Sequence, residues 1–181
     1  MTFLSQFTGF FKKIGFWLGS SRWLARALVK HSGLRNKSNI KILELGAGYG
    51  NVTKEILKHL GTDAVVIAIE NDEERIAYLE HITTDTTIEI IHADAQDLDQ
   101  HVTAGSIDVV ISTLPLGSLE QAVTEDILKK ISLALKHGGK YIQYQYWMAN
   151  KKDVKKVFHM EGIRFEPRNF SPAFIYVTEK R

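Results

Sequence analysis

The stretch Ile40-Lys-Ile-Leu-Glu-Leu-Gly-Ala-Gly-Tyr-Gly50 decides the fold of this chain. Residues 40–45 are short and largely apolar, which predicts a strand that is buried on both faces. Gly46, Gly48 and Gly50 let the backbone turn sharply and approach a ligand closely. A helix is expected over residues 51–60, ended by Gly61, with its free N–H groups directed at the turn. This arrangement is typical of a nucleotide-type site at the first crossover of a doubly wound α/β sheet.

The glycine spacing narrows the kind of nucleotide site. A dinucleotide fingerprint has the pattern G-x-G-x-x-G, whereas Glu44-Leu-Gly-Ala-Gly-Tyr-Gly50 does not. The segment resembles motif I of the class I S-adenosyl-L-methionine (SAM)-dependent methyltransferases. This resemblance implies SAM as the cofactor and makes Glu44, Gly46, Ala47, Gly48 and Gly50 candidate cofactor-binding residues. The alternative is a glycine-rich turn without a ligand, and the motifs downstream argue against it.

Length and composition set the limits of the remaining inferences. The chain has 181 residues, enough for one domain with an appended arm, and it contains no cysteine, which excludes disulfides and cysteine-based chemistry. Residues 1–41 carry eight Lys or Arg and no acidic residue, whereas residues 42–181 carry fifteen Lys or Arg and all twenty-one acids. A basic N-terminal segment of this kind predicts an anionic partner, either a membrane or a nucleic acid.

The N-terminal segment also has an apolar face. Apolar residues between positions 3 and 18 recur at helical spacing, and the run is too short and interrupted to span a bilayer. An interfacial membrane helix has this composition, but a helix that packs on the domain's own sheet has it too, and the sequence leaves both open. The candidate membrane-binding residues are Phe3, Phe7, Phe10, Phe11, Lys12, Lys13 and Trp17. We divide the chain into an amphipathic, basic arm over residues 1–39 and a SAM-binding domain over residues 40–181.

The rest of the chain alternates between strand and helix patterns. A second N-terminal helix is expected over residues 22–31, after a possible N-cap at residues 19–21. We expect seven strands, at residues 40–45, 64–69, 88–91, 107–111, 140–146, 163–166 and 173–177, with helices over residues 72–81, 120–135 and 151–159. The last two strands are expected to form an antiparallel pair. The predicted fold is therefore an α/β, doubly wound, Rossmann-like methyltransferase sheet with a C-terminal antiparallel hairpin and N-terminal amphipathic helices.

Polar residues follow several of these strands. Glu70, with Asn71 beside it, ends the second strand 24 residues after Gly46, where an acid can accept hydrogen bonds from ribose hydroxyls. Asp94 and Ala95 follow the third strand and resemble the methyltransferase element that binds the adenine edge. Ser112 ends the fourth strand and is delivered to the same carboxyl edge of the sheet. These residues complete the predicted cofactor-binding set.

Several segments together resemble the bacterial phospholipid N-methyltransferases. Residues 19–26 are similar to that family's P-S-S-R-x-L-A-R segment, with Gly19 in place of Pro, and residues 112–116 (S-T-L-P-L) to its S-x-L-P-L. Residues 169–173 (N-F-S-P-A) resemble its N-x-P-P-A, with Ser171 replacing one Pro. The resemblance implies methyl transfer from SAM to the amine of phosphatidylethanolamine and its methylated intermediates. It also implies a peripheral location on the inner, cytoplasmic face of an anionic membrane; we favour a monomer.

A rival family, the rRNA adenine dimethyltransferases, shares motif I and has a related N-L-P-Y motif after the fourth strand. In that family the Asn amide binds the target amino group and the aromatic residue stacks on the base. Here the matching positions are Thr113 and Leu116, which lack an amide and a ring, and this argues against nucleic acid as the substrate. Methylation of a small soluble amine, or binding without catalysis, stays open.

The candidate catalytic residues surround the expected position of the amine. Hydroxyl or carbonyl groups at Ser112, Thr113 and Leu114 are expected to accept hydrogen bonds from it, and no general base is identified. Tyr146 is a candidate for stabilising the positive charge of methylated intermediates, as are Tyr49 and Trp147. No metal-ligand pattern is present in the sequence.

Overall fold

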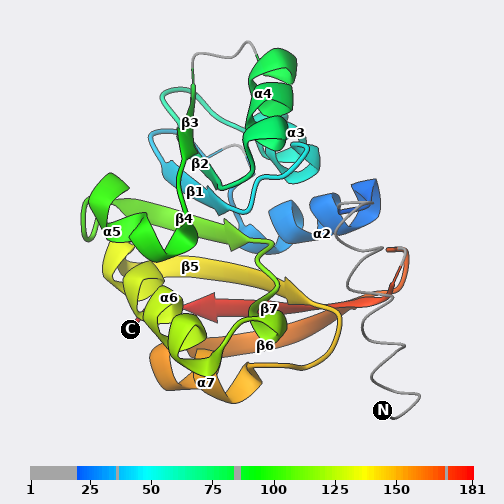
Figure 1. The fold of residues 1–181 in the computed structure, drawn as a ribbon, viewed down its shortest axis with the longest axis vertical. Coiled ribbons are helices and arrows are strands. Elements are labelled where there is room, and N and C mark those ends of the chain that lie inside the picture. The colour runs from blue at the N-terminus through cyan, green and yellow to red at the C-terminus, as the bar shows by residue number, and fades with distance from the viewer. Residues whose placement is uncertain (1–19, 36, 84–86, 170) are drawn as a thin grey trace.

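The computed structural model describes residues 20–35, 37–83, 87–169 and 171–181. Within these ranges the chain forms one seven-stranded sheet in the order β3-β2-β1-β4-β5-β7-β6 (Figure 1). The strands are β1 (Lys41–Leu45), β2 (Val65–Glu70), β3 (Ile88–His92), β4 (Ile107–Ser112), β5 (Leu135–Gln145), β6 (His159–Glu166) and β7 (Ala173–Glu179). The first five strands pair in parallel, and β7 runs antiparallel to both β5 and β6. The predicted doubly wound sheet with an antiparallel C-terminal hairpin is confirmed.

Helices cover both faces of the sheet (Figure 1). They are α2 (Arg22–Ser32), α3 (Asn51–Leu57), α4 (Glu73–Ile82), α5 (Leu98–His101), α6 (Gln121–Ala134) and α7 (Lys151–Val157), with 3-10 turns η1 (Ala95–Asp97) and η2 (Leu116–Ser118). Buried residues of α5, α6 and α7 pack on one face and those of α2 and α3 on the other. Alternation along β1 explains the two layers, because neighbouring residues of a strand point to opposite faces.

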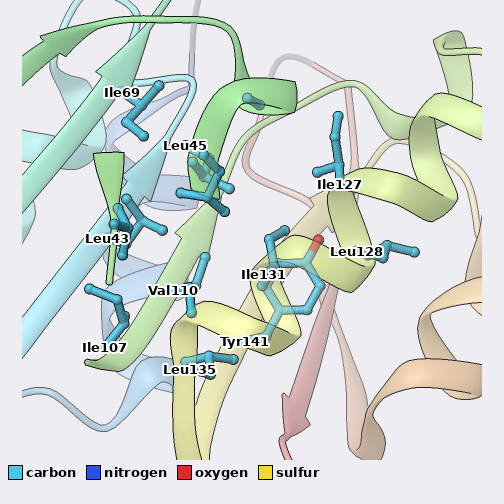
Figure 2. Packing of buried hydrophobic residues seen from close by; sticks show 14 of the residues in the cluster. Leu43, Leu45, Ile69, Ile107, Val110, Ile127, Leu128, Ile131, Leu135 and Tyr141 are labelled. Carbon is cyan, nitrogen blue, oxygen red and sulfur yellow. The ribbon is translucent and has the colours of Figure 1, made fainter. Parts of the chain in front are cut away.

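Figure 2 shows the larger core on the α6 side of the sheet. Leu43 and Leu45 of β1 and Val110 of β4 meet Ile127 and Ile131 of α6, and all five side chains are buried. The spacing of the two isoleucines by four residues places both on one face of the helix. The central strands are therefore covered on both sides, as their apolar sequences predicted.

Helix α2 belongs to the second core rather than to a separate arm. Its Leu24, Ala25, Leu28 and Val29 pack with Ile42 and other sheet residues, and all are buried. The helix begins at the N-cap Ser21, whose Oγ accepts a hydrogen bond from the Leu24 N–H, and ends at Gly33 with φ of 70°. Residues 1–19 lie outside the described part of the chain, so the predictions for Phe3, Phe7, Phe10, Phe11, Lys12, Lys13 and Trp17 stay predictions.

The predicted end of the helix after the glycine turn is wrong. Helix α3 ends at Leu57, not near residue 60, so Gly61 is not its C-terminal glycine. The Gly61 N–H instead donates to the Lys37 carbonyl at 3.1 Å, and a Cβ at this position would lie 2.5 Å from the same oxygen. Gly61 is thus required by the close approach of a segment that precedes β1, and no local pattern indicates such an approach. No helix within the described ranges is long and apolar enough to cross a bilayer.

Candidate active site

A cavity of about 440 Å³ lies at the carboxyl edge of the sheet, where β1 and β4 are neighbours but their following connections diverge. This is the position at which doubly wound sheets bind ligands. Predicted site residues from the ends of five different strands line it, namely Gly46, Ala47, Gly48, Glu70, Asn71, Asp94, Ala95, Thr113, Leu114 and Tyr146. The fold therefore brings ten of the predicted site residues together around one space.

The glycine turn forms the floor of this cavity. Gly46, Gly48 and Gly50 all have positive φ, at 76°, 56° and 73°, a conformation that other residues rarely adopt. A Cβ at Gly46 would lie 3.1 Å from Thr113 Oγ1 and 3.3 Å from Leu114 Cδ2. The absence of a side chain at Gly46 therefore keeps the floor low between β1 and the loop after β4.

Glu70 holds the turn from the neighbouring strand. Its Oε2 accepts a hydrogen bond from the Gly48 N–H at 2.7 Å, and its Oε1 accepts from the N–H groups of Asn71 and Asp72 at 3.1 and 3.2 Å. Arg75 Nη1 lies 3.8 Å from the same Oε1. A carboxylate oxygen has two lone pairs, so Glu70 retains acceptor capacity for a ribose hydroxyl at the cavity.

Asp94 is placed next to this acid. Its Oδ1 accepts from the Gln96 N–H at 2.8 Å, and Asn71 Nδ2 donates to its Oδ2 at 3.4 Å. Asn71 thus links the ends of β2 and β3, the two strand ends expected to bind ribose and adenine. Arg75 and Gln96, which also line the cavity, were not among the predicted residues because neither belongs to a strand-end motif.

Three predicted residues lie behind the cavity wall. Gly50 is the N-cap of α3, and a Cβ there would lie 2.7 Å from Leu79 Cδ1. Ser112 is fully buried, and its Oγ accepts the Leu114 N–H at 3.3 Å. Glu44 is also fully buried and points toward α3, where the Thr53 hydroxyl donates to its Oε2 at 2.7 Å. In this structure all three support the loops that line the cavity and do not line it themselves.

Glu44 is a buried carboxyl group with one unpaired oxygen. No hydrogen-bond partner in the described structure reaches its Oε1. Burial raises the pKa of Glu44 to about 8, although the hydrogen bond from Thr53 by itself lowers this pKa. The protonated form is favoured because a buried charge without a partner is costly. At neutral pH Glu44 is therefore mostly neutral and acts as a hydrogen-bonded structural group.

This raised pKa predicts a pH-dependent stability. An unfolded glutamate loses its proton near pH 4.5, whereas the folded protein keeps it up to about pH 8, so folding stability falls as the pH rises between these values. We expect a slope of about 1 kcal/mol per pH unit from this group. Glu44→Gln, which mimics the protonated acid, is expected to remove that slope and to unfold at higher denaturant concentration than the parent protein at pH 8. Parallel slopes for the two proteins in urea titrations at pH 5, 6.5 and 8 would contradict the assignment.

The loop after β4 is tied to both neighbouring strands. The Thr113 hydroxyl donates to the Gly46 carbonyl at 2.6 Å, and Gln143 Nε2 of β5 donates to the Leu114 carbonyl at 2.9 Å. Gln143 is itself fixed by the Tyr141 hydroxyl, which donates to its Oε1 at 2.8 Å. The Thr113 hydroxyl and the Leu114 carbonyl, which are expected to accept hydrogen bonds from an acceptor amine, are thus held in place before any substrate binds.

Aromatic rings also line the cavity. Tyr144 and Tyr146 of the β5 end pack edge to face with centroids 5.5 Å apart, and Tyr49 lies on the glycine turn. Burial raises the pKa of Tyr144, so its hydroxyl stays protonated. Trp147 does not line the cavity. Tyr144 was missed from the sequence, although its spacing of two residues from Tyr146 places both on one face of the strand.

A family model described as a methyltransferase domain matches residues 42–139. The chain belongs to this methyltransferase family. The glycine floor, the two strand-end acids and the open cavity fit SAM, which is the cofactor of this family's fold; no group of potential metal ligands occurs among the described residues.

The similarity to one curated relative extends beyond residues 42–139. Ornithine lipid N-methyltransferase from Singulisphaera acidiphila is 29% identical over 163 residues, which cover 87% of this chain and 83% of that protein. Among solved structures, TrmN from Thermus thermophilus has a TM-score of 0.73 at 21% identity, covering 87% of this chain and 48% of TrmN. A putative SAM-dependent methyltransferase from Listeria monocytogenes has a TM-score of 0.70 at 15% identity, covering 87% of this chain and 98% of that chain. The two structures support the fold alone.

Proposed function

We propose that this methyltransferase acts on the amine of phosphatidylethanolamine and its methylated intermediates at a membrane surface. The observation that carries this proposal is the loop at residues 112–116. Leu116, which matches the stacking aromatic of the rRNA enzymes, is the first residue of η2 and is fully buried, so a base cannot reach it. The Thr113 hydroxyl hydrogen is directed at the Gly46 carbonyl. The similarity to a lipid N-methyltransferase over most of both chains supports an acceptor of this class.

The residues of the acceptor side suit an amine. SAM supplies an electrophilic methyl group, and the acceptor must present an unprotonated nitrogen, although a primary amine has a pKa of about 10 in water. The apolar walls at Leu114, Pro115 and Leu119 lower an amine pKa by excluding water. The Tyr144 and Tyr146 rings stabilise the methylated, positively charged intermediates by about 0.5–2 kcal/mol. The chain thus positions and dehydrates the amine.

The folded domain also presents apolar side chains at the cavity edge. Trp147 and Met148 follow the end of β5 and are 70% and 56% exposed, and Phe165 is 58% exposed. Phe165 pairs with Phe174, which pairs with Gln145 at the same end of β5, so all three exposed residues lie at the carboxyl edge of the sheet. Exposed Trp, Phe and Met at one edge match the composition of a surface that enters the acyl boundary of a bilayer.

A double substitution tests this membrane contact. We expect Trp147→Ser with Met148→Ser to lower binding to anionic vesicles about tenfold, because two large apolar side chains no longer enter the bilayer. Leu133→Ser is the control, because Leu133 is also exposed, at 52%. Its carbonyl accepts a hydrogen bond from the N–H of Gly105, just before β4 begins, so Leu133 lies at the amino edge of the sheet, away from the cavity. Vesicle co-sedimentation measures both. Equal losses for the two variants would contradict a membrane contact at the cavity edge.

The function itself is tested with methyl-labelled SAM. The full chain is incubated with vesicles containing phosphatidylethanolamine, and in parallel with ribosomal RNA and with ethanolamine. We expect label in the organic phase after solvent extraction, in lipids with one or more added methyl groups. Label in RNA would favour the adenine dimethyltransferases, and label only in ethanolamine would favour a soluble amine; either result alone would overturn the proposal.

A further inference from the structure

Three guanidinium groups gather around one indole ring at the start of α2. The Cζ atoms of Arg168, Arg22 and Arg26 lie 4.6, 4.8 and 5.5 Å from the centroid of the Trp23 ring. Arg22 and Arg26 belong to α2, whereas Arg168 lies in the turn between β6 and β7. We call these four residues the Trp23 cluster.

Hydrogen bonds fix the two segments of the Trp23 cluster to each other. The Ser21 N–H donates to Asn169 Oδ1 at 3.0 Å, and the Ser21 hydroxyl donates to the Arg168 carbonyl at 3.3 Å. Asn169 is buried, and its Nδ2 donates to the Ser171 carbonyl. The first turn of α2 is therefore fastened to the β6–β7 turn, which limits how far the arginines can separate.

The positive charge of the cluster is only partly balanced. Arg168 forms a bidentate pair with Glu166, at 2.8 and 2.9 Å. Arg26 Nε lies 3.8 Å from Glu55 Oε1, a carboxylate that Lys58 and His59 also contact. Within the described part of the chain, no carboxylate lies within ion-pair distance of Arg22. Three guanidinium groups thus share few acidic partners, and an additional anion would be attracted to them.

The Trp23 cluster lies close in sequence to a residue of the cavity lining. Ser20 lines the cavity together with Tyr144 and Asn51, and Asn51 Nδ2 donates to the Ser20 carbonyl at 3.0 Å. Arg22 follows two residues later, at the first position of α2. None of the four cluster residues lines the cavity, so a cation there lies outside the space in which an acceptor amine has to meet the methyl donor.

We propose that Arg22, together with Arg168 beside Trp23, binds the anionic group that a lipid acceptor carries a few bonds from its amine. The inference rests on the proposed function. Guanidinium groups bind phosphate and carboxylate through paired hydrogen bonds, so the chemistry suits a phosphodiester or a lipid carboxylate. A contact of this kind would both attract the lipid and fix the position of its amine in the cavity. General attraction of the protein to an anionic surface, by contrast, would be lowered equally by removing any exposed Lys or Arg.

The test compares two variants that remove the same charge. Arg22→Gln lies in the Trp23 cluster, and Lys30→Gln changes an exposed residue two turns further along α2. The acceptors are phosphatidylethanolamine, an ornithine lipid with its carboxylate, and a long-chain alkylamine without an anionic group, each in neutral detergent micelles. We expect Arg22→Gln to raise KM at least about tenfold for one or both anionic acceptors, with kcat little changed, and to leave the alkylamine unaffected.

The other outcomes of this experiment identify the bound anionic group or overturn the site. The acceptor whose KM rises identifies phosphate or carboxylate as the bound group, and Lys30→Gln is expected to change none of the three. Equal effects of the two variants, or an equal effect of Arg22→Gln on the alkylamine, would overturn the anion site. Calorimetric titration with glycerophosphoethanolamine gives an independent readout: binding that Arg22→Gln abolishes supports the site even if no lipid is methylated, in which case only the proposed function fails. If lipids are methylated but glycerophosphoethanolamine does not bind and Arg22→Gln leaves every KM unchanged, the anion site is refuted and the proposed function stands.

Discussion

Gly46→Ala is expected to weaken SAM binding by at least about tenfold, and methyl transfer with it. The added Cβ would lie 3.1 Å from Thr113 Oγ1 and 3.3 Å from Leu114 Cδ2, both of which border the cavity. Either the floor rises or the loop after β4 moves away, and the Thr113 hydrogen bond to the Gly46 carbonyl is disturbed in both cases. Isothermal titration with SAM measures the loss directly.

Gly33→Ala provides the matched control. Gly33 has φ of 70°, close to the 76° of Gly46, and nothing lies within 4 Å of its added Cβ. Both variants therefore carry the cost of a left-handed alanine, about 1–2 kcal/mol of folding stability. Only Gly46→Ala changes the cavity, so equal SAM affinities for the two variants would show that the turn does not hold the cofactor.

Glu70→Ala is expected to reduce SAM affinity even further, by about a hundredfold. Its carboxylate accepts hydrogen bonds from the N–H groups of Gly48, Asn71 and Asp72, and it is 4% exposed. Removing it leaves three donors to rearrange, each at a cost of about 1–3 kcal/mol if it stays buried and unpaired. The turn then loses the contact that holds it open for the cofactor, along with the acceptor for the ribose.

Glu55→Ala separates this effect from a general loss of stability. Glu55 is a buried acid on α3 that pairs with Lys58, His59 and Arg26 and does not line the cavity. We expect it to lower the unfolding midpoint without changing SAM affinity measured on the folded protein. If both variants bind SAM as tightly as the parent chain, the contact between Glu70 and the Gly48 N–H has no part in cofactor binding.

The strand periodicities and the glycine turn were sufficient to predict the sheet. All seven segments predicted as strands became strands, although β5 and β6 begin earlier than predicted, at Leu135 and His159. The central strands were the clearest, because burial on both faces of a parallel sheet requires a short, nearly continuous apolar run. Glu70 and Asp94 were predictable for a related reason: parallel strands that follow crossovers all end at the same edge. The positions of Glu70 and Asp94 at the cavity were thus predictable from local patterns, whereas their roles in binding ribose and adenine stay predictions.

The sequence alone was enough to predict the strands, the longer helices and the residues at the strand ends, since these follow from apolar runs and helical periods within one segment. The short helix α5 was not predicted. Three features are visible only in the folded chain: α2 is part of the core, Glu44 and Ser112 lie behind the cavity wall, and Arg168 meets Trp23. These facts depend on contacts between distant segments, such as the hydrogen bond from Ser21 to Asn169, 148 residues away. Local periodicity carries no information about such pairs, because the free energy that forms them comes from packing in the complete fold.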